Sequence, residues 1–286
     1  MANIIIAEPH GFCFGINRAI ELVKDTAKKY PDKLIYFFGE LAHNQHILNW
    51  LEKDLKVKTT NSIDEIPLNS IIIIRPHGIT PNIYQQAQNR ELIVINATCP
   101  LVLKSHQIAK DLVKQKNQVI LLCSAVDHDE AVGIVGEAPD TIIPVILKDV
   151  LNFEIKNPDN TVVMTQTTLS TLETQRALNL LKEKYPKITI STHICQATTE
   201  RQNAIIKLAK EYQFVIIVGS TTSTNSNSLK SVAESVGAIS YIVDNASELN
   251  PKWFANQENI VVSSGASTPE DILNEVIEKI QQITRR

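Results

Sequence analysis

Three of the four cysteines follow similar apolar segments, and their placement suggests a shared chemical site. Cys13 comes after NIIIAEPHGF, Cys99 after LIVINAT and Cys195 after KITISTHI. Each segment is typical of a buried strand, and a helical pattern of apolar residues follows each cysteine. A thiolate at the start of a helix is stabilised by the helix dipole and by unpaired backbone N–H groups. The three cysteines are therefore candidate metal ligands.

An iron–sulfur cluster is the metal group that three such thiolates favour. Four thiolates usually hold a [4Fe–4S] cluster, so three leave one iron open for a substrate. Zinc bound by three cysteines and a histidine is an alternative, but the sequence lacks the closely spaced cysteine pairs of structural zinc sites. Three unrelated core cysteines are the alternative without a metal. We expect Cys123, which ends another apolar run, to be a buried thiol without a ligand role.

The cysteines recur because one order of elements repeats three times along the chain. After each cysteine and its helix, a second strand is expected at 33–39, 118–123 and 214–219. Short apolar strands that alternate with amphipathic helices predict parallel sheets, with ligands bound beyond the carboxyl ends of the strands. The expected fold is α/β, with three similar parallel-sheet modules in a pseudo-threefold trefoil around a central iron–sulfur cluster. The remaining expected strands are 56–60, 70–78, 142–147, 161–168, 239–243 and 259–267, and closing helices are expected to start at 80–86, 170–176 and 268–275.

The repeat also predicts where the modules begin and end. The first module is expected at 1–91 with Cys13, and its N-terminal strand can pack elsewhere. The second is expected at 92–186 with Cys99, and the third at 187–286 with Cys195.

Polar side chains gather at the expected strand ends, where they would surround the cluster. Imidazole, hydroxyl, carboxamide and backbone N–H groups together can hydrogen-bond a diphosphate without a basic groove. A single histidine is more often structural, and Ser, Thr or Asn before a helix is more often a cap. The prediction of a small anionic substrate therefore depends on their convergence. The residues are His43, His77 and His128 in the first two modules and Ser223, Thr224, Asn225 and Ser267 in the third.

Glu130 is the candidate proton donor, because a partly desolvated carboxylic acid can hold its proton near neutral pH. Thr167, in the segment TQTT, is a candidate to orient or relay that proton. The alternatives are an exposed glutamate in the acidic turn DHDE and a threonine that only caps a helix.

Composition excludes several other classes of function. The chain has 286 residues, 43% hydrophobic residues and a net charge of -3, and it has no run of basic residues. No apolar run reaches the roughly 20 residues that cross a bilayer, and the N-terminus does not read as a signal peptide. We therefore expect a cytoplasmic protein with a small-molecule partner, without nucleic acid or membrane binding. A metal-free nucleotide-binding protein lacks support, since neither GxGxxG nor a P-loop is present.

Across nearly its whole length the chain resembles the 4-hydroxy-3-methylbut-2-enyl diphosphate reductases of the non-mevalonate isoprenoid pathway. The motifs that carry the resemblance are GFCFG, AHN, PHG, ATCP, H-x-E at 128–130, TQTT at 165–168, IC-x-AT-x-x-RQ from 194, S-x-NSN from 223 and GASTP from 265.

The resemblance implies a specific enzyme. Such an enzyme takes electrons from an external carrier such as ferredoxin or flavodoxin, releases water, and yields isopentenyl and dimethylallyl diphosphates. Glu130 would donate a proton, with Thr167 at the substrate hydroxyl and His128 beside it. The resemblance also implies a [4Fe–4S] cluster on Cys13, Cys99 and Cys195, and diphosphate binding by His43, His77, His128, Ser223, Thr224, Asn225 and Ser267.

Some residues depart from the pattern of that family. They are His10, Gly39, Asp129 and Ser228. They leave open a divergent paralogue that acts on another allylic compound, and a non-enzymatic iron–sulfur redox sensor is the alternative from a different class.

Overall fold

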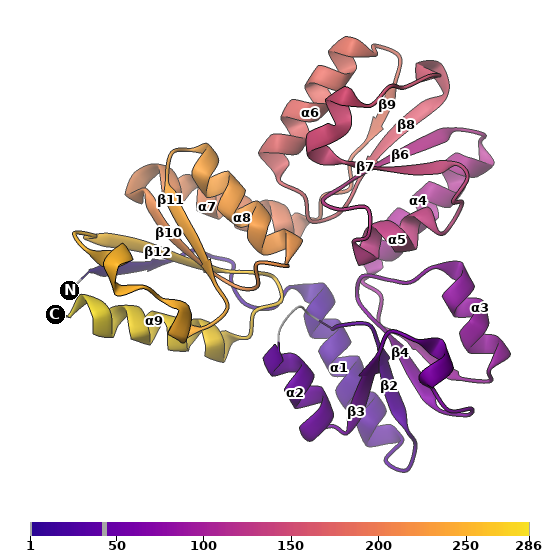
Figure 1. Cartoon of the computed structure of the whole chain (residues 1–286), viewed down its shortest axis with the longest axis horizontal. Coiled ribbons are helices and arrows are strands. Elements are labelled where there is room, and N and C mark those ends of the chain that lie inside the picture. Colours follow the sequence, from indigo (N-terminus) through magenta and orange to yellow (C-terminus); the bar gives the residue numbers. More distant parts are fainter. Residues whose placement is uncertain (1, 42–44, 286) are drawn as a thin grey trace. The chain divides into compact units, whose positions relative to one another are not determined.

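The structure, a computed structural model, describes residues 2–41 and 45–285 (Figure 1). The chain divides into two compact units. Unit 1 consists of Met1–Phe14, Thr168–Leu172 and Cys195–Arg286, and unit 2 consists of Gly15–Thr167 and Glu173–Ile194. Within the described ranges, no helix combines the length and apolar character needed to cross a membrane.

Unit 1 contains one four-stranded parallel sheet, sheet A, in the order β1-β12-β10-β11. Because side chains alternate along a strand, β10 contributes to two cores. Phe214 and Ile216 pack toward α9, while Val215 and Ile217 pack toward α7 and α8. Sheet A is therefore covered on both faces, as Figure 1 shows. The bounds are β1 Asn3–Ile6, β10 Phe214–Val218, β11 Ile239–Val243, β12 Asn259–Ser264, α7 Gln196–Tyr212, α8 Thr224–Ser235 and α9 Glu270–Thr284.

Unit 2 contains two further four-stranded parallel sheets. Sheet B has the order β3-β2-β4-β5 and sheet C the order β7-β6-β8-β9. The strands of sheet B are β2 Ile35–Phe38, β3 Val57–Thr60, β4 Ile71–Ile74 and β5 Ile93–Asn96; those of sheet C are β6 Gln118–Cys123, β7 Ile142–Ile146, β8 Thr161–Thr165 and β9 Thr189–Ser191. The remaining α-helices are α1 Phe14–Lys29, α2 Gln45–Lys53, α3 Pro81–Asn89, α4 Pro100–Lys114, α5 Asp129–Val135 and α6 Thr171–Lys184. Short 3₁₀ helices lie at Ile63–Glu65, Leu147–Asn152, Pro158–Asn160, Ala246–Glu248 and Pro251–Phe254.

The predicted α/β class with three parallel-sheet modules is confirmed, and the expected order of strands and helices is found in each repeat. The strand before each cysteine pairs with the sheet of another repeat. Thus β5, before Cys99, pairs with β4 of sheet B, and β9, before Cys195, pairs with β8 of sheet C. Likewise β1, before Cys13, pairs with β12 in sheet A. Each cysteine therefore lies where the chain leaves one sheet for the next. The division into domains at 1–91, 92–186 and 187–286 stays a prediction.

Candidate active site

Glu130 is a buried carboxyl group in the first turn of α5, and the residue is only 1% exposed. The helix starts here because His128 is its N-cap: Nδ1 of His128 accepts a hydrogen bond from the Glu130 N–H at 3.1 Å. Thr167 holds the carboxylate through two contacts. Oε1 accepts from the Thr167 N–H at 2.8 Å, and Oε2 lies 2.7 Å from the Thr167 hydroxyl. The carboxyl group therefore has a fixed orientation.

Burial raises the pKa of Glu130 from its ordinary 4.5 to about 6, although hydrogen bonds from Thr167 and the charge of His106 act in the opposite direction. A buried carboxyl group without a direct cationic partner prefers its neutral form. Because this pKa lies close to neutral pH, Glu130 is suited to give a proton and regain it.

His77 and His128 lie against each other, with ring centroids 5.8 Å apart in a T-shaped arrangement. His77 belongs to the turn after β4, where Gly78 adopts a left-handed φ of 82°. Arg75 ties this turn to the start of α5. Its Nε donates to the Gly78 carbonyl at 3.1 Å, and its guanidinium pairs with Asp129 at 2.9 Å.

Cys99 is the N-cap residue of α4 and is half-buried. Its backbone N–H donates to the carbonyl of Pro76 at 2.9 Å, so the turn that carries His77 is bonded to the cysteine segment. Arg18 supports the same segment from α1, since its guanidinium donates to the carbonyl of Thr98 at 3.1 Å. Unit 2 thus brings together Cys99, His77, His128, Glu130 and Thr167.

Unit 1 places the other two candidate ligands at helix starts. Cys195 is the N-cap of α7, and its Sγ accepts from the Thr198 N–H at 3.4 Å. Cys13 directly precedes α1, and its N–H donates to the Ala266 carbonyl at 2.9 Å. Both thiols are half-buried, so they are accessible to a ligand on one side.

Arg201, on α7, is a buried cation in the same unit and is 2% exposed. Its guanidinium donates to the Gly11 carbonyl at 2.5 Å, which fixes the loop before Cys13. Burial lowers the pKa of Arg201, while the negative charges of Cys13 and Cys195 raise it. Thiolates at these two positions therefore have a cation nearby.

The predicted diphosphate ligands of the third module lie around the start of α8 and after β12. Ser223 is the N-cap of α8 and accepts from the Ser226 N–H at 3.4 Å. The Oδ1 of Asn225 accepts from the Ala266 N–H at 3.0 Å, whereas its buried Nδ2 has no hydrogen-bond partner among the residues that the structure describes. Thr224 is the first residue of α8, and Ser267 is half-buried after β12. An unsatisfied buried amide is costly unless a ligand accepts from it.

The predicted site residues are thus divided between the units. Cys13, Cys195, Ser223, Thr224, Asn225 and Ser267 lie in unit 1, the residues around Glu130 lie in unit 2, and His43 is outside the described residues. Among the residues described, no group of three or more His, Cys, Asp or Glu side chains is placed to hold a metal ion. Cys123 is fully buried, and burial together with Asp127 raises the pKa of its thiol to about 12, so it stays a neutral thiol.

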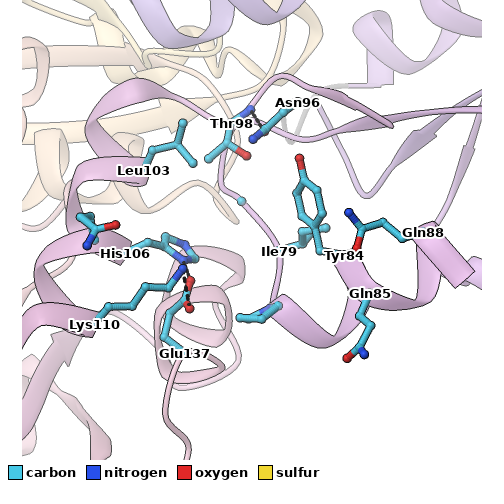
Figure 2. A pocket seen from close by; sticks show the side chains of 13 residues that line it. Ile79, Tyr84, Gln85, Gln88, Asn96, Thr98, Leu103, His106, Lys110 and Glu137 are labelled. Atoms are coloured by element: carbon cyan, nitrogen blue, oxygen red, sulfur yellow. Dashed lines mark hydrogen bonds and ion pairs between the residues drawn. The ribbon is translucent and has the colours of Figure 1, made fainter. Parts of the chain in front are cut away.

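Sequence reasoning missed Arg201 and a partly buried cluster of His106, Lys110 and Glu137, which lines a cavity of about 570 Å³ in unit 2 (Figure 2). The spacing of His106 and Lys110 by one helical turn was an available signal. Glu137 follows α5 and is far away in the sequence, so no local pattern linked it to them.

Comparison with known proteins identifies the family. A reductase named 4-hydroxy-3-methylbut-2-enyl diphosphate reductase from Wolbachia pipientis subsp. Culex pipiens is 39% identical over 96% of this chain and 90% of its own length. A solved structure of the E-1-hydroxy-2-methyl-but-2-enyl-4-diphosphate reductase from Plasmodium falciparum has a TM-score of 0.91 and 30% identity, covering 97% of this chain and 87% of its own.

A second solved structure, of (E)-4-hydroxy-3-methyl-but-2-enyl diphosphate reductase, described as the terminal enzyme of the non-mevalonate pathway, covers 99% of this chain and 100% of its own. Its identity is 31% and its TM-score 0.67. The family model described as LytB protein matches residues 4–281. The chain therefore belongs to the LytB protein family, as the sequence motifs predicted.

Proposed function

We propose that this protein is a 4-hydroxy-3-methylbut-2-enyl diphosphate reductase that yields isopentenyl and dimethylallyl diphosphates. Membership of a family whose curated relatives carry that name supports the proposal. The observation that carries it is the Glu130–Thr167 pair, in which a buried carboxyl group with a pKa of about 6 is held by one threonine. Loss of a hydroxyl as water requires such a proton donor.

Cys13, Cys99 and Cys195 would hold a [4Fe–4S] cluster in this proposal. Each thiol is half-buried at the start of a helix, and the thiolates of Cys13 and Cys195 have the buried cation Arg201 nearby. This donor set fits thiolate ligation of iron. When bound, the cluster would supply the electrons that reduction consumes, with an open iron for the substrate.

The protein's own residues would bind the diphosphate and deliver the proton. The buried Nδ2 of Asn225 supports an acceptor ligand beside Ala266. His128 and Thr167 would orient the substrate hydroxyl toward Glu130. The reduction consumes two electrons and two protons: Glu130 would give one proton as the C–O bond breaks and water leaves, and the second would form the new C–H bond of the product. The proposed ligands of the diphosphate are His43, His77, His128, Ser223, Thr224, Asn225 and Ser267. Electrons would come from an external cytoplasmic carrier such as ferredoxin or flavodoxin.

The first test is anaerobic purification with iron and sulfide analysis, followed by reduction and an assay with 4-hydroxy-3-methylbut-2-enyl diphosphate. Glu130→Gln keeps the shape of the acid but cannot give a proton, so we expect kcat to fall by about 10²–10⁴-fold. Asp127→Asn, an exposed carboxylate three residues earlier, is the matched control and should keep wild-type turnover.

The outcomes separate the alternatives. A full cluster with turnover that depends on Glu130 supports the reductase. A full cluster without turnover of this substrate would favour a paralogue or a redox sensor. Protein that holds no iron when oxygen is excluded would refute the cluster.

A further inference from the structure

His106, Glu137 and Lys110 form a partly buried polar cluster in unit 2, next to the helix whose first turn carries Glu130. His106 on α4 has a side chain 8% exposed, and its Nδ1 lies 2.6 Å from Oε1 of Glu137. The other oxygen of Glu137 lies 3.0 Å from Nζ of Lys110, and the Glu137 side chain is 5% exposed. Figure 2 shows both basic side chains directed at this carboxylate.

The ring of His106 fills the space between two glycines that flank the proposed site residues. A Cβ atom at Gly78 would lie 3.1 Å from Nε2 of His106, and one at Gly133 would lie 3.2 Å from Nε2 and Cε1. Gly78 directly follows His77, and Gly133 lies one helical turn after Glu130 in α5. The imidazole therefore lies close to both segments, and a side chain in place of either glycine would require the ring to shift by a few tenths of an ångström.

The contact between Nδ1 of His106 and Glu137, rather than packing alone, holds the ring in this position. Burial would raise the pKa of Glu137, but the hydrogen bonds and charges of His106 and Lys110 outweigh it and leave the pKa below its ordinary value. Glu137 is thus a fixed anion that orients Nδ1 of His106. The cavity of about 570 Å³ adjoins Gly78, His106 and Glu137, so a ring released from Glu137 has space to rotate.

We propose that His106 is a positioning residue of the reductase site: its ring, locked by Glu137, sets the separation between the turn that carries His77 and the helix that carries His128 and Glu130. This inference rests on the proposed function for its catalytic consequence. The ring of His106 would thereby maintain the short distance between the rings of His77 and His128.

His106 also acts on Glu130 through its charge. Thr167 faces the carboxyl group of Glu130 with two hydrogen bonds, and the charge of His106 lowers the pKa of Glu130. Among the described residues, the other titratable or charged groups near this cluster are Glu137 in contact with His106, Lys110 in contact with Glu137, the Arg75–Asp129 pair at the start of α5, and the imidazoles of His77 and His128. Because Glu130 must be protonated to act as an acid, removal of His106 should raise its pKa and move the alkaline limit of activity to higher pH.

The experiment compares His106→Ala, Glu137→Ala and Glu137→Gln with wild-type holoenzyme under anaerobic conditions. Gln107→Ala, at the next position on α4, is the control. Three quantities are measured: the affinity for inorganic diphosphate by calorimetry, kcat and KM across pH, and the pKa of Glu130 from ¹³C-carboxyl NMR. The Glu130 signal is assigned with Glu130→Gln.

We expect His106→Ala and Glu137→Ala to lower kcat/KM by about 10²-fold, the size expected for a misplacement of about 1 Å. Diphosphate affinity should fall by about tenfold through weaker binding at His77 and His128. Glu137→Gln keeps a hydrogen-bond acceptor for Nδ1 of His106. This variant should therefore keep most of the wild-type kcat/KM and diphosphate affinity that Glu137→Ala loses. The pKa of Glu130 should rise in His106→Ala, which a role in stability alone would not cause.

A folded His106→Ala enzyme with wild-type diphosphate affinity, kcat/KM and Glu130 pKa would overturn the proposal. If that variant does not fold, Glu137→Ala decides in the same way, with Glu137→Gln as the rescue. Wild-type protein that fails to turn over the substrate refutes the proposed function instead, while the NMR measurement still tests His106, because it needs neither substrate nor turnover.

Discussion

Glu130 and Glu137 lie at opposite ends of α5, and their pKa values move in opposite directions. Glu130 is 1% exposed, whereas Glu137 is half-buried as a residue, with a side chain that is 5% exposed. Glu130 is held by the neutral side chain and backbone of Thr167, so burial prevails and its pKa rises to about 6. Glu137 contacts two basic side chains, so its pKa falls. The comparison shows that a deeply buried carboxyl group with a neutral partner can bind a proton near pH 6, whereas a less buried one with two basic partners keeps its charge to lower pH.

His106 connects the two carboxyl groups, because its charge lowers the pKa of both. It contacts Glu137 directly but affects Glu130 without a hydrogen bond among those that the structure describes. His106 therefore affects Glu137 through a direct contact and Glu130 through a longer-range charge.

The largest stability effect is expected for Glu130→Gln. The folded pKa is raised from 4.5 to about 6, so the contribution of Glu130 to stability is fully present below pH 4.5 and is lost as pH rises through 6. Ionisation then costs wild type about 2 kcal/mol, which the glutamine variant avoids. Urea unfolding at pH 4.5, 6 and 8 should show the variant gaining stability over wild type with rising pH. If the difference in free energy of unfolding between the two proteins is the same at all three pH values, the ionisation of Glu130 does not destabilise the wild type.

Thr167→Val removes the hydroxyl but leaves the backbone N–H that binds Oε1 of Glu130. At pH 8, where Glu130 is ionised, we expect a loss of about 1.5 kcal/mol, because the carboxylate loses one hydrogen bond. The pKa of Glu130 should rise further, which ¹³C NMR can measure. Thr189→Val, at an exposed position of β9, is the control. An unchanged pKa in Thr167→Val would show that the hydroxyl contact does not stabilise the charged form.

Lys110→Met should have the smallest effect, because the lysine side chain is 42% exposed and water screens its charge. We expect a loss of about 0.5 kcal/mol at pH 7. Since the pKa of Glu137 is lowered, its contribution is present above pH 4.5 and is lost as pH falls through the folded pKa. The loss should therefore shrink in acid and in high salt. Lys114→Met, on the same helix, provides the comparison, and equal losses in both variants would argue against a specific role for Lys110.

The sequence predicted much of this fold because its signals are local. Alternation of apolar strands and helices, with a cysteine before each of three helices, depends on residues close in the chain. The pairing of β5 with sheet B and of β9 with sheet C was not predicted. No local sequence pattern indicates which of several distant strands will be neighbours in a sheet. Glu130 was predicted as a proton donor, and the structure adds its burial and its contacts with Thr167, while its catalytic role stays a proposal.

The cluster of His106, Lys110 and Glu137 could not be predicted either, because its members are brought together by tertiary packing and not by a local pattern. Glu137 reads as one more charged surface residue after a short helix, and only the packing of α4 against α5 makes it the partner of His106. From the sequence alone, Gly78 indicates only a turn, and Gly133 only a residue of low helix propensity. Their lack of a side chain matters only because an imidazole from another helix occupies that space.

The pairing of β1 with β12 has a consequence for how the protein is made. Asn3 aligns with Asn259, and the loop with Cys13 is bonded to Ala266, so the first candidate ligand has its structural support near the far end of the chain. During synthesis from the N-terminus, β1 stays unpaired until β12 has left the ribosome. Sheets B and C can form earlier. A cluster bound by Cys13, as proposed, would therefore be inserted only after β12 has formed, late in synthesis or after it.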